Sequence, residues 1–159
     1  MTTSDPLRQE LAKYLDSAEA HASADAALDG IPPQLRGVRP EGLPHSAWEL
    51  LEHIRITQRD ILDFCRPNYK ELDWPADYWP KSPAPPAPTA WDESVARFHD
   101  DRAAMIAIAE DSSIDLFARV PNGDGQTYLR ELLLAADHTS HHLGQLILVR
   151  RLLGAWPAK

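Results

Sequence analysis

Apolar side chains recur every three or four residues in four stretches of the chain, which is the spacing of one face of an α-helix. Prolines and glycines are concentrated between these stretches, where they would interrupt a helix. The pattern predicts one helix before Gly30, one after Ser46, one after a proline-rich segment that ends near Thr89, and a last one that ends near Gly154. Only residues 114–120 fit a short extended piece. The sequence therefore predicts an all-α fold, a four-helix bundle with long crossover connections.

Capping residues support the expected helix ends. Asp5 or the serine before it can cap the first helix, with Pro6 at the first helical position, where its missing N–H costs nothing. Ser46 and Glu49 have the spacing of a capping box, in which each side chain accepts a hydrogen bond from the backbone N–H of the other. Thr127 is placed to cap the last helix. We expect the first helix to continue without a break until just before Gly30.

The segment 66–91 contains seven prolines and three tryptophans and cannot form a regular helix. Its "SPAPPAPT" part favours polyproline II, so the simplest interpretation is a stiff spacer that wraps the outside of the bundle. An alternative is that its aromatic residues Trp74, Tyr78 and Trp79 form a wall of a substrate pocket. Trp48 is a further candidate for this pocket, although a core position is the simpler interpretation.

Composition and charge narrow the class of protein. The chain has 159 residues, 43% of them hydrophobic, and is expected to form one domain over residues 1–159. The formal net charge is −8, and the largest basic cluster is the pair Arg150 and Arg151, so a nucleic-acid partner is not expected. Cys65 is the only cysteine, which excludes an internal disulfide and suits a reducing compartment. Signal-peptide and membrane-spanning patterns are missing, so we expect a cytoplasmic protein that does not bind membranes.

Histidines crowd the middle of the last predicted helix. His138 and His142 are four residues apart, so about 6 Å of rise places both rings on one helix face, close enough to share a cation. Val149 and Gln145 continue the same face, which indicates that it looks into the bundle. His141 lies towards the edge of this face and is the rival ligand. Gln145 either orients a ligand or substrate or bridges two helices.

A third ligand is expected from a facing helix, and His53, in the middle of the second predicted helix, is the natural supplier. The simpler interpretation of each histidine is a core residue with a hydrogen-bonded ring. Other metal motifs fail, because Thr139 stands where HExxH needs glutamate and the chain lacks the carboxylates of a di-iron bundle. Three neutral imidazoles would leave coordination positions open, as in a catalytic site.

Two segments carry a family likeness. "SAWELLEHIRITQRDILDF" and "ADHTSHHLGQLILVRRLLGAW", together with "WPADYWP", resemble the DinB/YfiT-like superfamily of bacterial metal-binding four-helix bundles. The resemblance implies His53, His138 and His142 as metal ligands, with His141 behind them. It implies a divalent transition metal, zinc or nickel first and iron or manganese as alternatives. It also implies a homodimer.

Characterised members of that family include thiol-dependent S-transferases and isomerases that use bacillithiol, mycothiol or similar small thiols. The hypothesis is therefore a metal-dependent enzyme that joins a low-molecular-weight thiol to a small electrophile. A metal-dependent hydrolase is the alternative, with Glu49, one turn before His53, as the better candidate base. A non-catalytic metal-binding or dimerising stress protein stays open, in which Gln145 or Glu49 would complete the metal coordination.

Overall fold

The computed structural model describes residues 5–16 and 20–157, and the regular secondary structure of this part of the chain is helical, which confirms the all-α prediction. Among the described residues, extended pairing is limited to one isolated antiparallel bridge between Arg119 and Thr127. The helices are α1 (Pro6–Asp16), α2 (Ala24–Leu28), α3 (Ala47–Phe64), α4 (Ala90–Glu110) and α5 (Tyr128–Leu152), with a short 3₁₀ turn at Pro33–Leu35.

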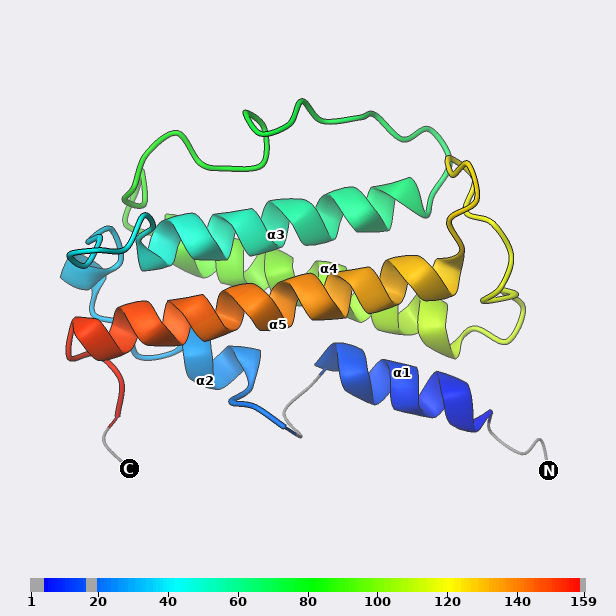
Figure 1. The fold of residues 1–159 in the computed structure, drawn as a ribbon, viewed down its shortest axis with the longest axis horizontal. Helices are drawn as coiled ribbons and strands as arrows, with labels where there is room; N and C mark the ends of the chain where they lie inside the picture. The colour runs from blue at the N-terminus through cyan, green and yellow to red at the C-terminus, as the bar shows by residue number, and fades with distance from the viewer. Residues whose placement is uncertain (1–4, 17–19, 158–159) are drawn as a thin grey trace.

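Four of these helices, α1, α3, α4 and α5, lie side by side as a bundle, and short α2 lies against α5 (Figure 1). The segment 65–89 carries the chain from the end of α3 back along the bundle, so α3 and α4 run in the same direction. Helix α5 returns antiparallel to both. Helix α3 packs against α4 on one side and against α5 on the other, which makes it the central element of the site described below.

The predicted length of the first helix is wrong. Instead of continuing to Gly30, the chain ends α1 at Asp16 and begins α2 at Ala24, while residues 17–19 lie outside the described part. Ser23 restarts the helix because its side chain accepts a hydrogen bond from the backbone N–H of Ala26 at 3.1 Å. In this region the apolar spacing that predicted one continuous helix consists of alanines. Alanine side chains bury little apolar area and do not force one straight helix.

The other helix starts are as predicted. Ser46 Oγ accepts from the Glu49 N–H at 3.2 Å, and the Glu49 carboxylate accepts from the Ser46 N–H at 2.8 Å, which completes the capping box. Thr127 Oγ1 accepts from the Arg130 N–H at 3.2 Å. Thr89 precedes α4 without a side-chain cap. The two helices that carry the candidate ligands thus both have capped N-termini.

The buried apolar residues form two clusters, one towards each end of the bundle. The first is built around the start of α3 and the end of α5, and it includes Trp48, Trp91 and Phe98. The second is built around the end of α3 and the start of α5, with Leu11 and Leu15 added from α1. On α5, His138 and His142 fall between these two clusters in the chain, and on α3 His53 lies among the last residues of the first cluster. Both ends of the bundle therefore hold α3 and α5 together around the site.

The apolar spacing of residues 90–110 predicts an inward face with Trp91, Val95, Phe98, Ala103, Met105, Ile106 and Ala109, and α4 follows it in part. Trp91, Phe98, Met105 and Ala109 are buried, but Ala103 is exposed. Two polar residues are buried instead. These are Ser94 and Asp101, which face polar partners on α3. Apolar periodicity could not reveal this face because the α3–α4 contact is partly built from hydrogen-bonded side chains.

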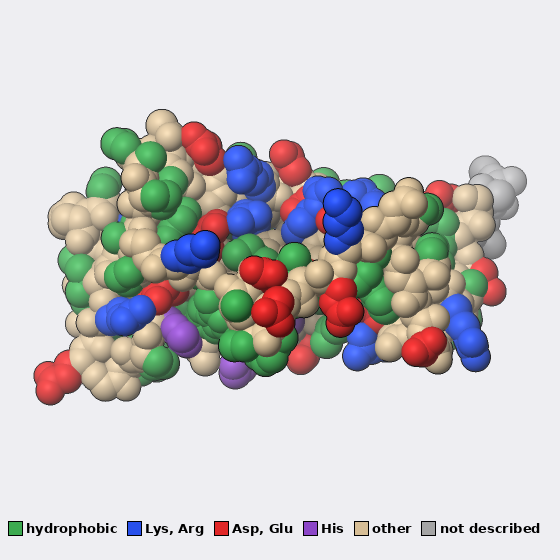
Figure 2. All heavy atoms as spheres, turned by 90° about the horizontal axis from the view of Figure 1, so that it is seen from above, with side chains coloured by type: hydrophobic (Ala, Val, Ile, Leu, Met, Phe, Trp, Pro, Cys, Tyr) green, Lys and Arg blue, Asp and Glu red, His purple; other side chains and the backbone are tan. Residues whose placement is uncertain are grey.

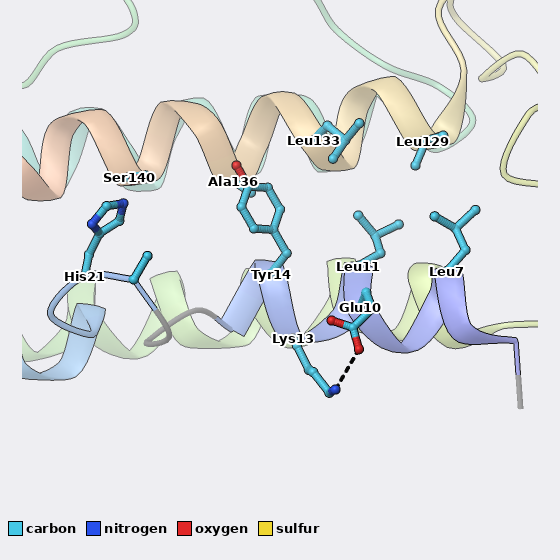
Figure 3. Close-up of a pocket in the computed structure, with 11 residues that line it drawn as sticks. Leu7, Glu10, Leu11, Lys13, Tyr14, His21, Leu129, Leu133, Ala136 and Ser140 are labelled. Atoms are coloured by element: carbon cyan, nitrogen blue, oxygen red, sulfur yellow. Dashed lines mark hydrogen bonds and ion pairs between the residues drawn. The ribbon is translucent and has the colours of Figure 1, made fainter.

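Helix α1 lies beside α5 with an open groove of about 540 Å³ between them (Figure 3). Leu7 and Tyr14 of α1 and Leu133 of α5 line this groove and are exposed. The histidines of the candidate site are not among its lining residues. Helix α1 packs mainly against α4, so it contributes to the bundle without forming part of the site.

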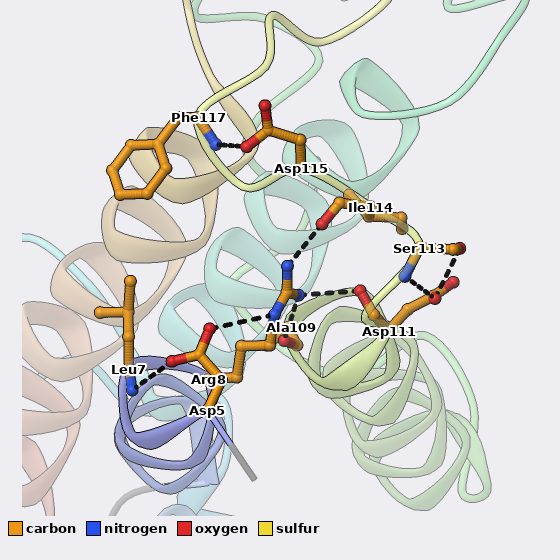
Figure 4. Close-up of polar contacts among 9 residues, drawn as sticks. All are labelled: Asp5, Leu7, Arg8, Ala109, Asp111, Ser113, Ile114, Asp115 and Phe117. Atoms are coloured by element: carbon orange, nitrogen blue, oxygen red, sulfur yellow. Dashed lines mark hydrogen bonds and ion pairs between the residues drawn. The ribbon is translucent and has the colours of Figure 1, made fainter. Parts of the chain in front are cut away.

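A single arginine fixes α1 to the end of α4 (Figure 4). The Arg8 guanidinium donates to the carbonyl oxygens of Ala109, Asp111 and Ile114 at 3.0, 2.8 and 2.5 Å. These carbonyls lie at or just beyond the last turn of α4, where helix acceptors lack partners within the helix. Arg8 therefore caps α4 from a neighbouring helix.

The face seen from above shows acidic and basic side chains interspersed, and only small areas of histidine surface (Figure 2). This is the face that carries the segment 65–89. The imidazoles are thus largely covered on this side of the molecule.

Among the described residues, every helix is too short or too polar to span a lipid bilayer.

Candidate metal centre

His53 of α3 and His138 and His142 of α5 form a three-histidine cluster at the α3–α5 interface. One ring nitrogen from each residue lies within 4.8 Å of the other two. The Nε2 atoms of His53 and His138 are 3.1 Å apart. Two nitrogens bound tetrahedrally to one zinc ion are separated by about 3.3 Å, as follows from Zn–N bonds of about 2.0–2.1 Å. The spacing of these donors therefore fits a single metal ion.

Two of the three rings are oriented by hydrogen bonds on their outer side. His53 Nδ1 lies 2.8 Å from the carbonyl oxygen of Tyr78, which can only accept, so Nδ1 carries the proton. His142 Nδ1 donates to Gln145 Oε1 at 2.7 Å. In both rings this leaves Nε2 without a proton, and the Nε2 of His53 faces His138. Outer hydrogen bonds of this kind fix the tautomer and orientation of metal-binding histidines.

Burial keeps the cluster uncharged at neutral pH. His53 is 2% exposed, and burial lowers its pKa despite the hydrogen bond to Tyr78. Burial, with repulsion from the neighbouring imidazoles, lowers the pKa of His138 to about 3. Burial likewise lowers the pKa of His142 to about 4. The three rings are therefore neutral at pH 7, which is the form that binds a metal.

The chemistry of the donor set fits a first-row transition metal. The cluster consists of imidazoles alone within the described part of the chain. Imidazole nitrogen suits Zn, Ni, Cu and Fe, whereas Mg and Ca prefer oxygen ligands. Three protein donors on a tetrahedral or larger coordination sphere leave at least one position for a molecule from solution.

The segment 65–89 covers one side of the cluster with an aromatic residue. The Trp79 ring stacks on His53 with centroids 3.8 Å apart and an interplanar angle of 2°. The same tryptophan stacks on His45, at 4.1 Å. His45 directly precedes Ser46, the N-cap of α3, and lies outside the helix that carries His53. No spacing rule could place it here, because its link to the site runs through Trp79, a loop residue 34 positions away in the chain.

The sequence predicts three further residues near the metal, namely Gln145, His141 and Glu49, and they differ in what they contact. Gln145 contacts His142 through the hydrogen bond given above. The His141 ring lies 4.8 Å from the His142 ring but is exposed and stands outside the cluster. Glu49 accepts from Arg39 Nε at 2.8 Å and from a second Arg39 nitrogen, in addition to its place in the capping box. Its carboxylate is thus held by the α3 N-terminus and by Arg39.

Of the four aromatic residues predicted at a substrate pocket, the structure brings two to the cluster. Tyr78 and Trp79 contact His53 through a backbone carbonyl and a ring face. Trp48 is buried in the first core cluster and packs near Trp91, at 6.5 Å between ring centroids. Trp74 is 67% exposed and reaches the site only through the Tyr78 ring. Their role in substrate binding stays a prediction.

These features define the class of protein: an all-α bundle with a three-histidine candidate metal centre between two antiparallel helices. The chain belongs to the DinB superfamily, because the family model described by that name matches residues 9–146. The matched stretch includes all three histidines. Searches among curated proteins and among solved structures found no match.

Proposed function

We propose that the protein is an enzyme that binds one divalent transition metal through His53, His138 and His142. In this proposal it transfers a low-molecular-weight thiol to a small electrophile. The observation that carries the proposal is the convergence of three neutral imidazoles whose ring nitrogens lie within 4.8 Å. Two of these imidazoles have their outer nitrogen bonded to an oxygen acceptor, and such an arrangement is prepared for a cation.

The surrounding residues would perform distinct tasks in this reaction. The Tyr78 carbonyl and Gln145 hold protons at Nδ1 of His53 and His142, so that both Nε2 atoms stay available. Trp79 covers one ring face of His53 and excludes water from it. A divalent cation at this centre supplies a Lewis acid that favours the thiolate form of a thiol at neutral pH.

The reaction itself is a substitution at carbon. The thiol sulfur forms a bond to the electrophilic carbon while the leaving group departs with its bonding electrons, and the thiol proton passes to water. The hydrolytic alternative needs a free base near the centre. Glu49, the predicted base, is bonded to Arg39 and to the α3 N-terminus, which favours the thiol-dependent reaction. The homodimer and the cytoplasmic location stay predictions.

The first test is the metal content of protein purified without chelator. We expect about one transition metal per chain in the wild type and none in a triple variant with alanine at the three histidines. The matched control is His141→Ala, which removes an exposed imidazole from the same turn of α5. Circular dichroism confirms that each variant folds. A wild type without metal after reconstitution with zinc, nickel, iron and manganese would refute the proposal.

The second test is activity. The metal-loaded protein is mixed with bacillithiol, mycothiol, glutathione or coenzyme A and with a chromogenic electrophile such as 1-chloro-2,4-dinitrobenzene. We expect a rate above that of the metal-free protein for at least one thiol. A metal-dependent release of 4-nitrophenol from 4-nitrophenyl acetate in the absence of thiol, without any thiol transfer, would instead support the hydrolase. Metal binding without either activity would support the non-catalytic alternative.

A further inference from the structure

A chain of hydrogen bonds joins His53 to a carboxylate two helical turns away on the same helix. The Tyr78 carbonyl accepts from His53 Nδ1 at 2.8 Å, and the Tyr78 hydroxyl donates to Asp60 Oδ2 at 2.7 Å. His53 and Asp60 are seven residues apart on α3, so they lie on one face of the helix, about 10 Å apart along its axis. Tyr78 therefore lies along α3 and is held at both ends.

The Asp60 carboxylate is a double acceptor for the crossover segment. Its other oxygen, Oδ1, accepts from the Tyr69 hydroxyl at 2.9 Å. Tyr69 and Tyr78 are both in the segment 65–89, and both are partly buried. This carboxylate thus attaches the irregular segment to α3 at two points. Of these two, only Tyr78 continues to His53.

A loop backbone is normally a poor support for a metal ligand, because loops move more than the helices they join. The carbonyl that orients His53 belongs to such a loop, so its position depends on what holds the loop there. Trp79 stacking adds contact to the His53 ring face but does not select its tautomer. Apart from the bond to His53 itself, the hydrogen bond from the Tyr78 hydroxyl to Asp60 is the direct polar link between this residue and α3.

We propose that Tyr78 and Asp60 are positioning residues for the metal centre. Through them the crossover segment 65–89 holds the His53 ring in its metal-binding tautomer and orientation and so raises metal affinity. The inference rests on the metal site of the proposed function and extends it to two residues outside the ligand set. Removing an outer partner of a metal-binding histidine typically lowers metal affinity by about 10–100-fold, and loss of a support one bond further away acts in the same direction with a smaller effect.

The test uses Tyr78→Phe, which removes one hydroxyl and keeps the ring and the backbone carbonyl. Zn²⁺ affinity is measured by competition with a chromophoric chelator, and the site is also examined through the visible absorption of bound Co²⁺. We expect about threefold to tenfold weaker Zn²⁺ binding and an altered Co²⁺ spectrum. The matched control is Tyr69→Phe, which breaks the same kind of bond to the same carboxylate without a link to His53. Its affinity and spectrum should equal those of the wild type.

A readout in the metal-free protein separates this proposal from the metal site itself. Long-range ¹H–¹⁵N NMR of the imidazoles reports which ring nitrogen of His53 carries the proton. We expect the Nδ1–H form in the wild type and in Tyr69→Phe, and a mixture of both tautomers in Tyr78→Phe. In Asp60→Asn the amide oxygen can still accept from one tyrosine. The fraction of the Nδ1–H form of His53 in this variant should therefore lie between that of the wild type and that of Asp60→Ala.

Two results would overturn the inference. The first is an unchanged tautomer and unchanged Zn²⁺ affinity in Tyr78→Phe. The second is an equal loss in Tyr69→Phe, which would indicate a general loosening of the segment. If the wild type binds no metal at all, the proposed function fails. The NMR comparison of the two tyrosine variants then decides alone whether Tyr78 positions His53.

Discussion

Helix α3 buries polar side chains on two sides, and the two sides are built on different principles. Towards α4, Glu52 accepts from Arg55 at 2.8 and 2.9 Å and from the Ser94 hydroxyl. Gln58 Nε2 donates to the Phe98 carbonyl at 2.8 Å. In these contacts each donor meets an acceptor, and the charges of Glu52 and Arg55 are complementary. This polar cluster is thus satisfied by the protein alone.

Towards α5, the buried polar groups are of one kind. His53, His138 and His142 bring ring nitrogens to the same point, with the Nε2 atoms of His53 and His138 3.1 Å apart, and their rings lie 4.5–4.8 Å apart between centroids. Neighbouring imidazoles lower one another's pKa, so none gains from being close to the others. The comparison teaches that a buried polar cluster is structural when its members pair with one another. It indicates a ligand when they converge on a common point.

The largest expected effect comes from supplying the cation on the α5 side. Zn²⁺ at a free concentration a thousand times its Kd should raise the free energy of unfolding by about 4 kcal/mol, because the ion binds the folded chain. Denaturant unfolding with Zn²⁺ and with a chelator measures this difference. The triple histidine variant should show none. An equal stabilisation of that variant would mean that zinc binds elsewhere.

A smaller effect on the free energy of unfolding is expected when a polar contact between α3 and α4 is removed. Glu52→Ala leaves the Arg55 guanidinium and the Ser94 hydroxyl without their partner, and should lower the free energy of unfolding by about 2–3 kcal/mol at pH 7. Metal content should not change, because the residue faces the other helix. The control is Asp100→Ala, at an exposed position of α4, which should have little effect.

This loss should also depend on pH. Burial raises the pKa of Glu52, but hydrogen bonds from Arg55 and Ser94 outweigh burial and hold it below its ordinary value of 4.5. A carboxylate with a lowered pKa in the folded state stabilises the fold above that ordinary value, and the stabilisation is lost as pH falls through the folded-state pKa. The difference between wild type and Glu52→Ala should therefore be constant near neutral pH and shrink in acid. A difference that grows in acid would contradict the assignment.

The smallest effect is expected at Thr57, one turn beyond His53. Its hydroxyl is buried without a hydrogen-bond partner among the described residues. Thr57→Val removes this unpaired group at nearly constant shape and should raise the free energy of unfolding by about 0.5–1 kcal/mol. Thr57→Ser keeps the hydroxyl and loses a methyl group, so it should be destabilising. Urea unfolding of the two variants measures the difference, and a destabilised valine variant would show that the hydroxyl has a partner.

The sequence predicted the parts of the site that depend on local spacing. The spacing of four positions from His138 to His142 places both on one helix face, and the capping box at Ser46 sets the start of α3. What it missed comes from contacts between segments distant in the chain. His45 reaches the site through Trp79, and Asp101 is buried because Arg59 of α3 faces it at 3.2 Å. Neither contact leaves a periodic signal, since each depends on how an irregular segment or a neighbouring helix lies in space.

Arg8 has a consequence for how the molecule opens. It holds α1 by three carbonyls at the end of α4, and the apolar contribution of α1 to the core is largely Leu11 and Leu15. Detachment of α1 would break these contacts and the Arg102–Asp16 ion pair and leave the α3–α5 contact in place. Amide protons of α1 are therefore expected to exchange with solvent through a local opening of low free energy, whereas those around His53 exchange through unfolding of the whole bundle. Helix α1 and the histidine centre belong to cooperative units of different stability.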